Sequence, residues 1–290
     1  MSASLLVDCG AMRKAPMTPE EIRKGRDDIV ASRGPWRSDN LRLAKNVFTI
    51  GEGEAGREAR VRRAVQVVAD IARSRLSGLR VLDLSCGEGG LALELGKDGA
   101  EVVAFEGQAA LAEKASFARD ALGLHHVTIV RGDVRRLSPE EHGFFDVILA
   151  LGVLDRLDAP AVFEVAAKLG SVCKGFALVE ARIVPRARAT REGNGILYRG
   201  SPRSRDGEPS FLLTRASMLS LLTRSGFTSI VETLHPEAEA GVPCFAAFKG
   251  RRVALQTAPQ ANAVPPTEWG DASPAAEASG IARLLRRGRR

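Results

Sequence analysis

The chain has 290 residues, of which 44% are hydrophobic and 27% charged, and a formal net charge of +7. This composition excludes a wholly disordered chain, a collagen-like fibre and a small disulfide scaffold. No apolar run approaches the roughly 18 residues of a membrane span, so we expect no transmembrane segment.

The excess positive charge gathers at the C-terminus. Residues 279–290 contain five arginines and no acid, and the rest of the chain holds 37 basic against 35 acidic residues. A polyanionic partner such as RNA is therefore indicated only through this tail. The four cysteines stand far apart, and the N-terminus does not resemble a signal peptide. We expect a cytoplasmic protein with no disulfide framework and no metal site.

The first fifty residues show no strand pattern but contain a helix start. Thr18 offers an N-cap hydroxyl, Pro19 suits the first helical position and Glu21 completes a capping box, which predicts a helix over residues 19–32. Apolar residues at helical spacing predict a second helix over residues 56–75. We expect residues 1–55 to form a helical cap.

From residue 79 onward, short apolar runs alternate with helical stretches. This alternation predicts an α/β domain over residues 56–252, with a mostly parallel sheet covered by helices on both faces. Only a short connection separates the last two strands, so the final strand should be antiparallel. An Ala/Pro-rich linker and the basic tail follow at residues 253–290. The predicted strands span residues 80–84, 101–105, 127–131, 145–150, 176–183, 228–234 and 244–249, and the predicted helices span residues 89–97, 109–122, 159–169 and 215–225, with a short helix after Ser138.

A glycine-rich turn ends the first of these strands. Gly87 and Gly89 let a ligand approach the backbone where the next helix begins. Gly87-x-Gly89-x-x-Ala92, followed by Glu106, also satisfies the dinucleotide fingerprint, so an NAD enzyme is an alternative. Asp83 argues against it, because a carboxylate beside the helix N-terminus repels a pyrophosphate. That acid favours a ligand with an ammonium group, such as S-adenosylmethionine.

Two further acids follow the next strands. Glu106 ends the second strand and can accept both ribose hydroxyls, and Asp133 follows the third strand and can accept the adenine amino group. The carboxyl ends of the strands are where open α/β sheets bind ligands. Three acids at successive strand ends therefore predict an S-adenosylmethionine site.

These segments resemble the class I S-adenosylmethionine-dependent methyltransferases. The resemblance rests on Leu82–Gly89, Phe105-Glu106, Gly132-Asp133-Val134 and Phe145–Ile148, with Ser85 standing where the family usually has glycine or alanine. It implies a seven-stranded sheet in the order 3-2-1-4-5-7-6 with strand seven antiparallel, and S-adenosylmethionine as the cofactor. The cofactor-binding residues that it implies are Asp83, Ser85, Gly87, Gly89, Glu106, Gly107, Asp133, Val134, Leu149 and Ala150.

A narrower resemblance concerns segments on either side of these motifs. The chain is similar to bacterial methyltransferases related to the tRNA wobble-uridine carboxymethyltransferase. Where that branch has an aromatic residue and a histidine after its Gly-Val-Leu, this chain has Asp155 and Arg156. The resemblance rests on Trp36, Asn40, Phe48-Thr49, Leu151–Leu154, Phe211–Thr214 and Gly226-Phe227.

The acceptor side offers fewer signals. Asp155 follows the fourth strand and is a candidate base or a helix cap, and Glu180 on the fifth strand suits either substrate contact or a salt bridge. His235 is expected at the surface. Residues 182–205 hold seven arginines against one acid, which predicts a loop over the active site and an anionic substrate. In this loop Arg188, Arg191 and Tyr198 are candidate substrate residues.

The sequence thus predicts an S-adenosylmethionine-dependent methyltransferase that acts on a small molecule bearing an anionic group. One alternative is a tRNA- or rRNA-modifying methyltransferase that uses the arginines for phosphate contacts. Another is a non-catalytic cofactor-binding module whose tail recruits a partner or a membrane. The oligomeric state is not indicated.

Overall fold

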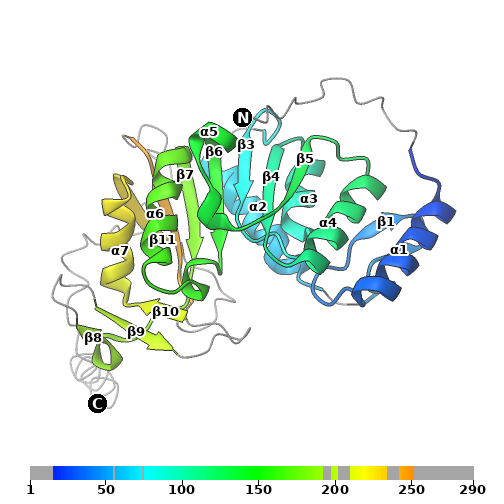
Figure 1. The fold of residues 1–290 in the computed structure, drawn as a ribbon. Coiled ribbons are helices and arrows are strands. Elements are labelled where there is room, and N and C mark those ends of the chain that lie inside the picture. The colour runs from blue at the N-terminus through cyan, green and yellow to red at the C-terminus, as the bar shows by residue number, and fades with distance from the viewer. Residues whose placement is uncertain are drawn as a thin grey trace, which may run out of the picture. The chain divides into compact units, whose positions relative to one another are not determined.

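Seven strands form the central sheet of the computed structural model, which describes residues 16–54, 56–73, 75–191, 197–201, 210–233 and 242–250 (Figure 1). The strands are β3 (Arg80–Asp83), β4 (Glu101–Glu106), β5 (Val127–Arg131), β6 (Phe145–Leu151), β7 (Cys173–Glu180), β11 (Ser229–Thr233) and β12 (Cys244–Phe248). Their order is β11-β12-β7-β6-β3-β4-β5, and β12 runs antiparallel to both of its neighbours while the other pairs are parallel. The predicted strand order and the antiparallel last strand are confirmed.

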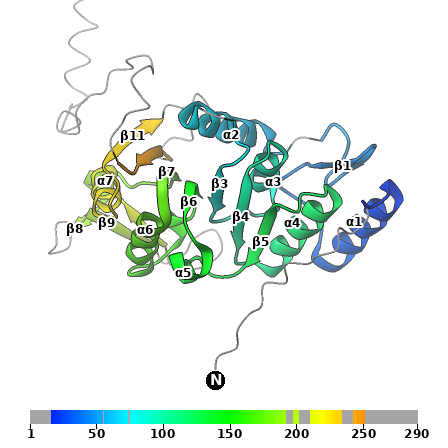
Figure 2. The ribbon, with the colours of Figure 1, turned by 90° about the horizontal axis from the view of Figure 1, so that it is seen from above.

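Helices cover both faces of this sheet (Figure 2). One face packs on α2 (Glu58–Ala72), α3 (Gly90–Lys97) and α4 (Ala109–Ala121), and α1 (Pro19–Arg33) packs against α4. The other face packs on α6 (Ala161–Val172) and α7 (Arg215–Arg224). A separate hydrophobic core forms on each face of the sheet. In β3, Val81 belongs to the core under α2, α3 and α4, and its neighbour Leu82 belongs to the core under α6 and α7. Successive strand side chains point to opposite faces, so a strand apolar throughout needs cover on both.

Local capping explains several helix starts. The Thr18 hydroxyl accepts a hydrogen bond from the Glu21 N–H while the Glu21 carboxylate accepts from the Thr18 N–H, which is the predicted capping box. Ser138 caps the short α5 (Pro139–His142), and Thr214 caps α7 through the Ser217 N–H. These bonds satisfy N–H groups that have no partner inside the helix.

The N-terminal segment differs from the prediction that it lacks strands. A two-stranded antiparallel ribbon joins β1 (Arg42–Ala44) to β2 (Val47–Phe48). Asn46 makes the turn between them in the left-handed region, at φ +59°. Strands of three and two residues are too short to show a period in the sequence, which is why the ribbon was missed.

The arginine-rich segment also differs from the predicted loop. It contains β8 (Thr190–Arg191) and β9 (Leu197–Ser201), which pair with β10 (Ser210–Leu213) as an antiparallel sheet in the order β10-β9-β8. Part of the prediction was therefore wrong, because strand pairing can order glycine- and arginine-rich sequence that shows no apolar alternation. The preceding strand β7 also starts three residues earlier than predicted, directly after α6.

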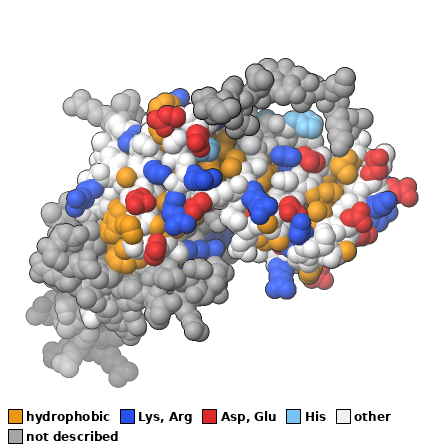
Figure 3. Space-filling model, in the orientation of Figure 1, with side chains coloured by type: hydrophobic (Ala, Val, Ile, Leu, Met, Phe, Trp, Pro, Cys, Tyr) orange, Lys and Arg blue, Asp and Glu red, His pale blue; other side chains and the backbone are white. Residues whose placement is uncertain are grey.

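The described residues belong to a compact unit that spans residues 1–252. None of its described helices combines the length and apolar character that a membrane crossing requires. On the face drawn in Figure 3, cationic and acidic side chains are interspersed over the described surface. The predicted linker and tail at residues 253–290 lie outside the described residues, and the three-part division of the chain stays a prediction.

Candidate cofactor and active site

The glycine-rich turn connects β3 to α3 in a conformation that requires glycine. Gly87 and Gly89 have φ values of +59° and +99°, in the region that side chains disfavour. A Cβ atom on Gly89 would lie 3.1 Å from the Cβ atom of Ala115 on α4. The Cys86 N–H donates to the Phe105 carbonyl oxygen over 3.0 Å, which ties the turn to β4. The turn therefore presents backbone rather than side chains at the carboxyl edge of the sheet.

Two buried acids flank this turn. The side chain of Asp83 accepts one backbone hydrogen bond, from the Ser85 N–H at 3.3 Å, and burial raises its pKa to about 7. The negative charges of Glu106 and Asp39 add to this increase in pKa. Glu106 accepts from the N–H groups of Gly87, at 2.9 Å, and Gln108, at 2.8 Å. A buried carboxylate with a raised pKa and no bonded cation is suited to a positively charged ligand group.

The third predicted acid lies nearer to solvent. Asp133 caps the 3-10 turn Val134–Arg136, and its carboxylate accepts from the Arg135 backbone N–H and pairs with the Arg135 guanidinium. These bonds, the side-chain bond foremost, lower the pKa of Asp133. Gly107 directly follows β4, so Glu106, Gly107, Asp133 and Val134 all lie at the carboxyl ends of neighbouring strands. Leu149 and Ala150 lie within β6, fully buried in the two opposite cores.

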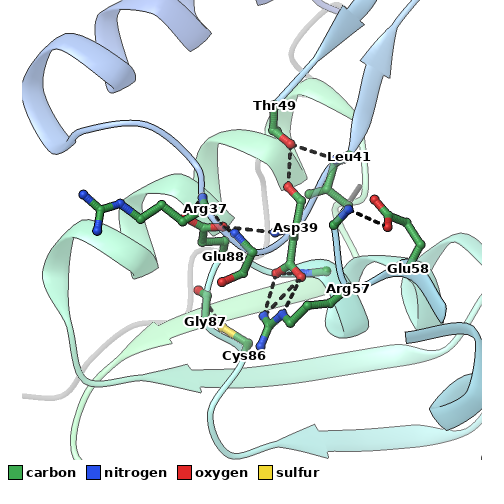
Figure 4. Close-up of polar contacts among 12 residues, drawn as sticks. Arg37, Asp39, Leu41, Thr49, Arg57, Glu58, Cys86, Gly87 and Glu88 are labelled. Carbon is green, nitrogen blue, oxygen red and sulfur yellow. Dashed lines mark hydrogen bonds and ion pairs between the residues drawn. The ribbon is translucent and has the colours of Figure 1, made fainter. Parts of the chain in front are cut away.

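A carboxylate of the glycine turn anchors the N-terminal segment (Figure 4). Glu88, between the two glycines, accepts from the backbone N–H groups of Arg37, at 3.0 Å, Ser38, at 2.8 Å, and Asp39, at 3.2 Å. Its other partner is Lys114 of α4, whose Nζ lies 3.2 Å away and also donates to a backbone carbonyl of the N-terminal segment over 2.6 Å. Both side chains are buried, so this ion pair joins three parts of the chain in the interior.

The segment that Glu88 anchors brings a second ion pair to the turn. The buried Asp39 carboxylate accepts from the Gly90 N–H, at 3.0 Å, and pairs with Arg57 over 3.1 Å. A Cβ atom on Gly90 would lie 2.6 Å from this carboxylate, so only glycine permits the approach. Thr49 and Asn40 hold the same segment, Thr49 by donating to the Asp39 carbonyl oxygen and Asn40 by donating to two further backbone carbonyls.

Sequence analysis missed Asp39, Arg57, Glu88 and Lys114 as parts of the site. Glu88 and its backbone partners are about fifty positions apart, a separation that no local pattern reveals. One signal was present: Lys114 interrupts the apolar face of the predicted helix 109–122 between Leu111 and Ala118. A lysine at a buried helical position needs a partner, and the structure supplies it.

On the acceptor side, the two candidate acids pair with arginines. Asp155 lies in the 3-10 turn Leu154–Arg156 after β6, is 5% exposed, and accepts from Arg182 Nε at 2.5 Å. Its Oδ1 atom is buried without a hydrogen-bond partner among the described residues. Glu180, at the end of β7, pairs with Arg60 of α2. The structure therefore contains the salt bridge that was one of the two interpretations of Glu180, and Asp155 does not cap α6, whose N-cap residue is Pro160.

Residues of the cofactor side and of the acceptor side line one cavity between α2 and the glycine turn. Arg57, Arg60, Asp83, Ser85 and Leu151 are among the residues that line it. The candidate substrate residues Arg191 and Tyr198 lie on β8 and β9, and Arg188 ends a 3-10 turn before them. Their side chains and His235 lie outside the described residues. Within the described part of the chain, no group of three His, Cys, Asp or Glu side chains gathers as a metal site.

Comparison with known proteins agrees with this site. Residues 81–175, from β3 into β7, match the family model described as a methyltransferase domain. A search of curated proteins finds none that matches this chain significantly. The segment that carries the glycine turn and the strand-end acids is thus similar to a methyltransferase domain.

Solved structures share the fold at low sequence identity. The N-terminal domain of EvdMO1, solved with S-adenosylhomocysteine bound, is 19% identical with a TM-score of 0.64, covering 82% of this chain and 98% of that domain. Against the longer EvdMO1 chain the TM-score is 0.57 at 19% identity, covering 80% of this chain and 47% of that one. Magnesium protoporphyrin IX methyltransferase from Synechocystis PCC 6803, solved with S-adenosylmethionine, is 17% identical with a TM-score of 0.50. The match covers 82% of this chain and 100% of that one. The narrower resemblance to the tRNA-modifying branch stays a prediction.

Proposed function

We propose that this protein transfers the methyl group of S-adenosylmethionine to a small molecule that carries an anionic group. The observation that carries the proposal is the buried Asp83 carboxylate, whose pKa is raised to about 7 beside a turn that exposes backbone. An ammonium group placed there would stabilise the ionised carboxylate, whereas a pyrophosphate would be repelled by it. This arrangement favours a methyltransferase over the NAD enzyme that the same glycines allow.

The other strand-end acids fit the rest of the cofactor. Glu106 uses one lone pair on each oxygen for the Gly87 and Gln108 N–H groups, so further lone pairs are available for two ribose hydroxyls. Asp133 is partly exposed and its lowered pKa favours the ionised form, whose oxygens can accept from the adenine amino group. When bound, S-adenosylmethionine supplies a sulfonium that makes its methyl group electrophilic. The protein's task is then to align an acceptor atom and to exclude water.

We assign the proton-accepting role to Asp155. Arg182 holds Oδ2, and the buried Oδ1 has no hydrogen-bond partner among the described residues, which leaves it available for a substrate hydroxyl. A base is needed only when the attacking atom carries a proton that must leave. Glu180, which ends β7 and pairs with Arg60 of α2, is a second acidic position toward the substrate.

The arginines support an anionic substrate. Arg60 lines the cavity, and Arg182 begins the arginine-rich segment that includes Arg188 and Arg191. Guanidinium groups recognise carboxylates and phosphates through paired N–H donors. The interspersed charges on the face in Figure 3 give less support to a long nucleic-acid partner.

A methyl-transfer screen tests the proposal. The purified full-length chain is incubated with S-adenosylmethionine labelled in its methyl group and with pools of carboxylated metabolites, phosphorylated metabolites or bulk tRNA. We expect label in a small acidic molecule. Label in tRNA alone would contradict the substrate class, and failure to bind S-adenosylmethionine in calorimetry would contradict the activity itself.

Asp155→Asn sharpens the test once a substrate is known. Loss of general-base catalysis should lower the rate about 10²- to 10⁴-fold while S-adenosylhomocysteine still binds. Asp158→Asn is the matched control, because Asp158 is an exposed acid three residues along the chain. An unchanged rate in Asp155→Asn would remove Asp155 from the catalytic step.

A further inference from the structure

The ion pair of Arg182 and Asp155 on the acceptor side leaves hydrogen-bonding groups unused on both partners. Arg182 Nε donates to Asp155 Oδ2 over 2.5 Å, and within the described part of the chain the two Nη atoms of Arg182 make no hydrogen bond. The buried Oδ1 atom of Asp155 likewise has no partner among the described residues. An arginine and a carboxylate bind most strongly as a fork, through two parallel N–H donors. This pair is not arranged as a fork, so it is not built for stability alone.

Backbone hydrogen bonds join the two segments that carry this pair. The Gly152 N–H donates to the Glu180 carbonyl oxygen over 2.7 Å, which links the chain just before Asp155 to the chain just before Arg182. Strand β10 links them again: it donates to the segment after Asp155 and accepts from the segment after Arg182, through backbone hydrogen bonds of 3.0 Å each. The free donors and the free acceptor are therefore constrained relative to each other by the backbone as well as by the ion pair.

The two members of the pair differ in exposure. About 40% of the Arg182 side chain is exposed, against 6% of the Asp155 side chain. The free Nη donors can thus bind an anion that arrives from solvent, whereas the free oxygen lies in the interior, where an acceptor without a partner is costly. A substrate hydroxyl on Oδ1 would supply that partner. The guanidinium would meanwhile offset the repulsion between Asp155 and an anionic group on the same substrate.

We infer that Arg182 binds the carboxylate of the substrate, and that its pair with Asp155 selects a hydroxy acid whose hydroxyl and carboxylate stand on adjacent carbon atoms. This inference rests on the proposed function and deepens it by naming the substrate class. A hydroxyl several carbon atoms from the carboxylate would not reach Oδ1 while the carboxylate is bound to the same ion pair. A carboxylate carries a single charge, so it repels Asp155 less than a phosphate does.

The reaction that this arrangement supports is the formation of a methyl ether. The hydroxyl oxygen forms a bond to the methyl carbon as the bond between that carbon and sulfur breaks. The hydroxyl proton passes to Asp155 Oδ1 and from there to solvent. The products are the methyl ether of the acid and S-adenosylhomocysteine. Arg182 holds the carboxylate throughout, so the attacking oxygen stays aligned.

The test uses isomers that differ only in the spacing of their two groups. Transfer of a labelled methyl group by the full chain is measured with 2-hydroxybenzoate against 4-hydroxybenzoate, and with 3-hydroxyhexanoate against 6-hydroxyhexanoate. The KM of the isomers with adjacent groups should be at least about tenfold lower, because only these isomers engage Arg182 and Asp155 together.

Arg182→Met should remove this preference. Loss of a charge-assisted hydrogen bond should raise the KM of the adjacent isomers about 10- to 100-fold. The KM of the distant isomers and the Kd for S-adenosylhomocysteine should stay within about twofold. Arg186→Met is the matched control, because Arg186 is an exposed arginine four residues along the chain, and it should change none of these values.

Arg182→Lys separates binding from folding. The lysine keeps a cation beside the buried Asp155 but lacks the planar paired donors, and thermal unfolding checks that the fold is retained. This variant should also raise the KM of the adjacent isomers alone. Equal KM values for both isomers, an equal change for both in Arg182→Met, or no label in any of the four acids while the cofactor binds would overturn the inference. If the unaltered protein did not bind S-adenosylmethionine, the proposed function itself would fail.

Discussion

The two halves of the site hold their acids in different ways. On the cofactor side, Asp83 and Glu106 accept hydrogen bonds from backbone N–H groups, those of Ser85 and Gly87 in the glycine turn and that of Gln108 after β4. On the acceptor side, Asp155 and Glu180 pair with arginine side chains from distant parts of the chain. Backbone donors cannot leave without unfolding the turn, whereas an arginine can exchange one anion for another. The cofactor half is therefore preorganised for one ligand, and the acceptor half can be re-specified by a few side chains.

The largest effect that we expect concerns the buried ion pair between Glu88 of the glycine turn and Lys114 of α4. Lys114→Met should lower the free energy of unfolding by about 3 kcal/mol, because it leaves Glu88 charged and buried without its cation. Denaturant unfolding measures this loss. Lys97→Met breaks the surface pair with Glu94 and should change stability by less than about 1 kcal/mol. Equal effects of the two variants would mean that the buried pair does not anchor the turn.

Cofactor affinity separates the two kinds of acid directly. Asp83→Ala should weaken S-adenosylhomocysteine binding by about 1.5–3 kcal/mol, the value of a hydrogen bond to a charged group. Asp155→Asn should leave that affinity within about twofold, because its partner Arg182 lies on the acceptor side. Calorimetry on both variants decides the matter. A comparable loss in the two would erase the distinction between the halves.

The pH dependence of binding should report on Asp83. Its pKa of about 7 in the folded chain lies above the ordinary value of 3.8, so the proton favours the folded state without ligand, and this contribution to stability falls as the pH rises from about 4 to 7. A cationic ligand group needs the ionised form. Affinity for S-adenosylhomocysteine should thus fall about tenfold, or about 1.4 kcal/mol, for each pH unit below 7. Asp83→Asn should bind weakly at every pH; a wild-type-like slope in this variant would assign the titration elsewhere.

The smallest effect on cofactor binding is expected from the arginine-rich segment. Reversing the charges of Arg188 and Arg191 should raise the KM for an anionic substrate and leave the cofactor Kd within about twofold, or ~0.4 kcal/mol. The effect on KM should shrink with added salt, since exposed charges are screened over about 10 Å at 0.1 M. A shift in cofactor Kd with unchanged substrate kinetics would mean that this segment contributes to cofactor binding and not to substrate binding.

The sequence alone determined the parts of the molecule whose signals are local. Strands β3 to β6 lie within about a residue of their predicted bounds, because runs such as Val81–Leu84 must be buried on both faces wherever they pack. The glycine turn and the acids Asp83, Glu106 and Asp133 were also predicted, since each acid lies at or just after the end of its own strand and parallel strands end at one edge. The capping box of Thr18 and Glu21 required no more than four neighbouring residues.

Only the tertiary structure decided which distant residues meet. Glu88 joins backbone N–H groups fifty positions away and Lys114 on another helix, and Asp39 joins Gly90 and Arg57. The ribbon of β1 and β2 and the sheet of β8 to β10 depend on pairing between strands too short or too polar to show a period. A buried ion pair requires a partner, which the sequence can signal through a lysine on an apolar helix face. Which of the chain's 35 acids fills that role is fixed by packing, because their local sequences do not distinguish them.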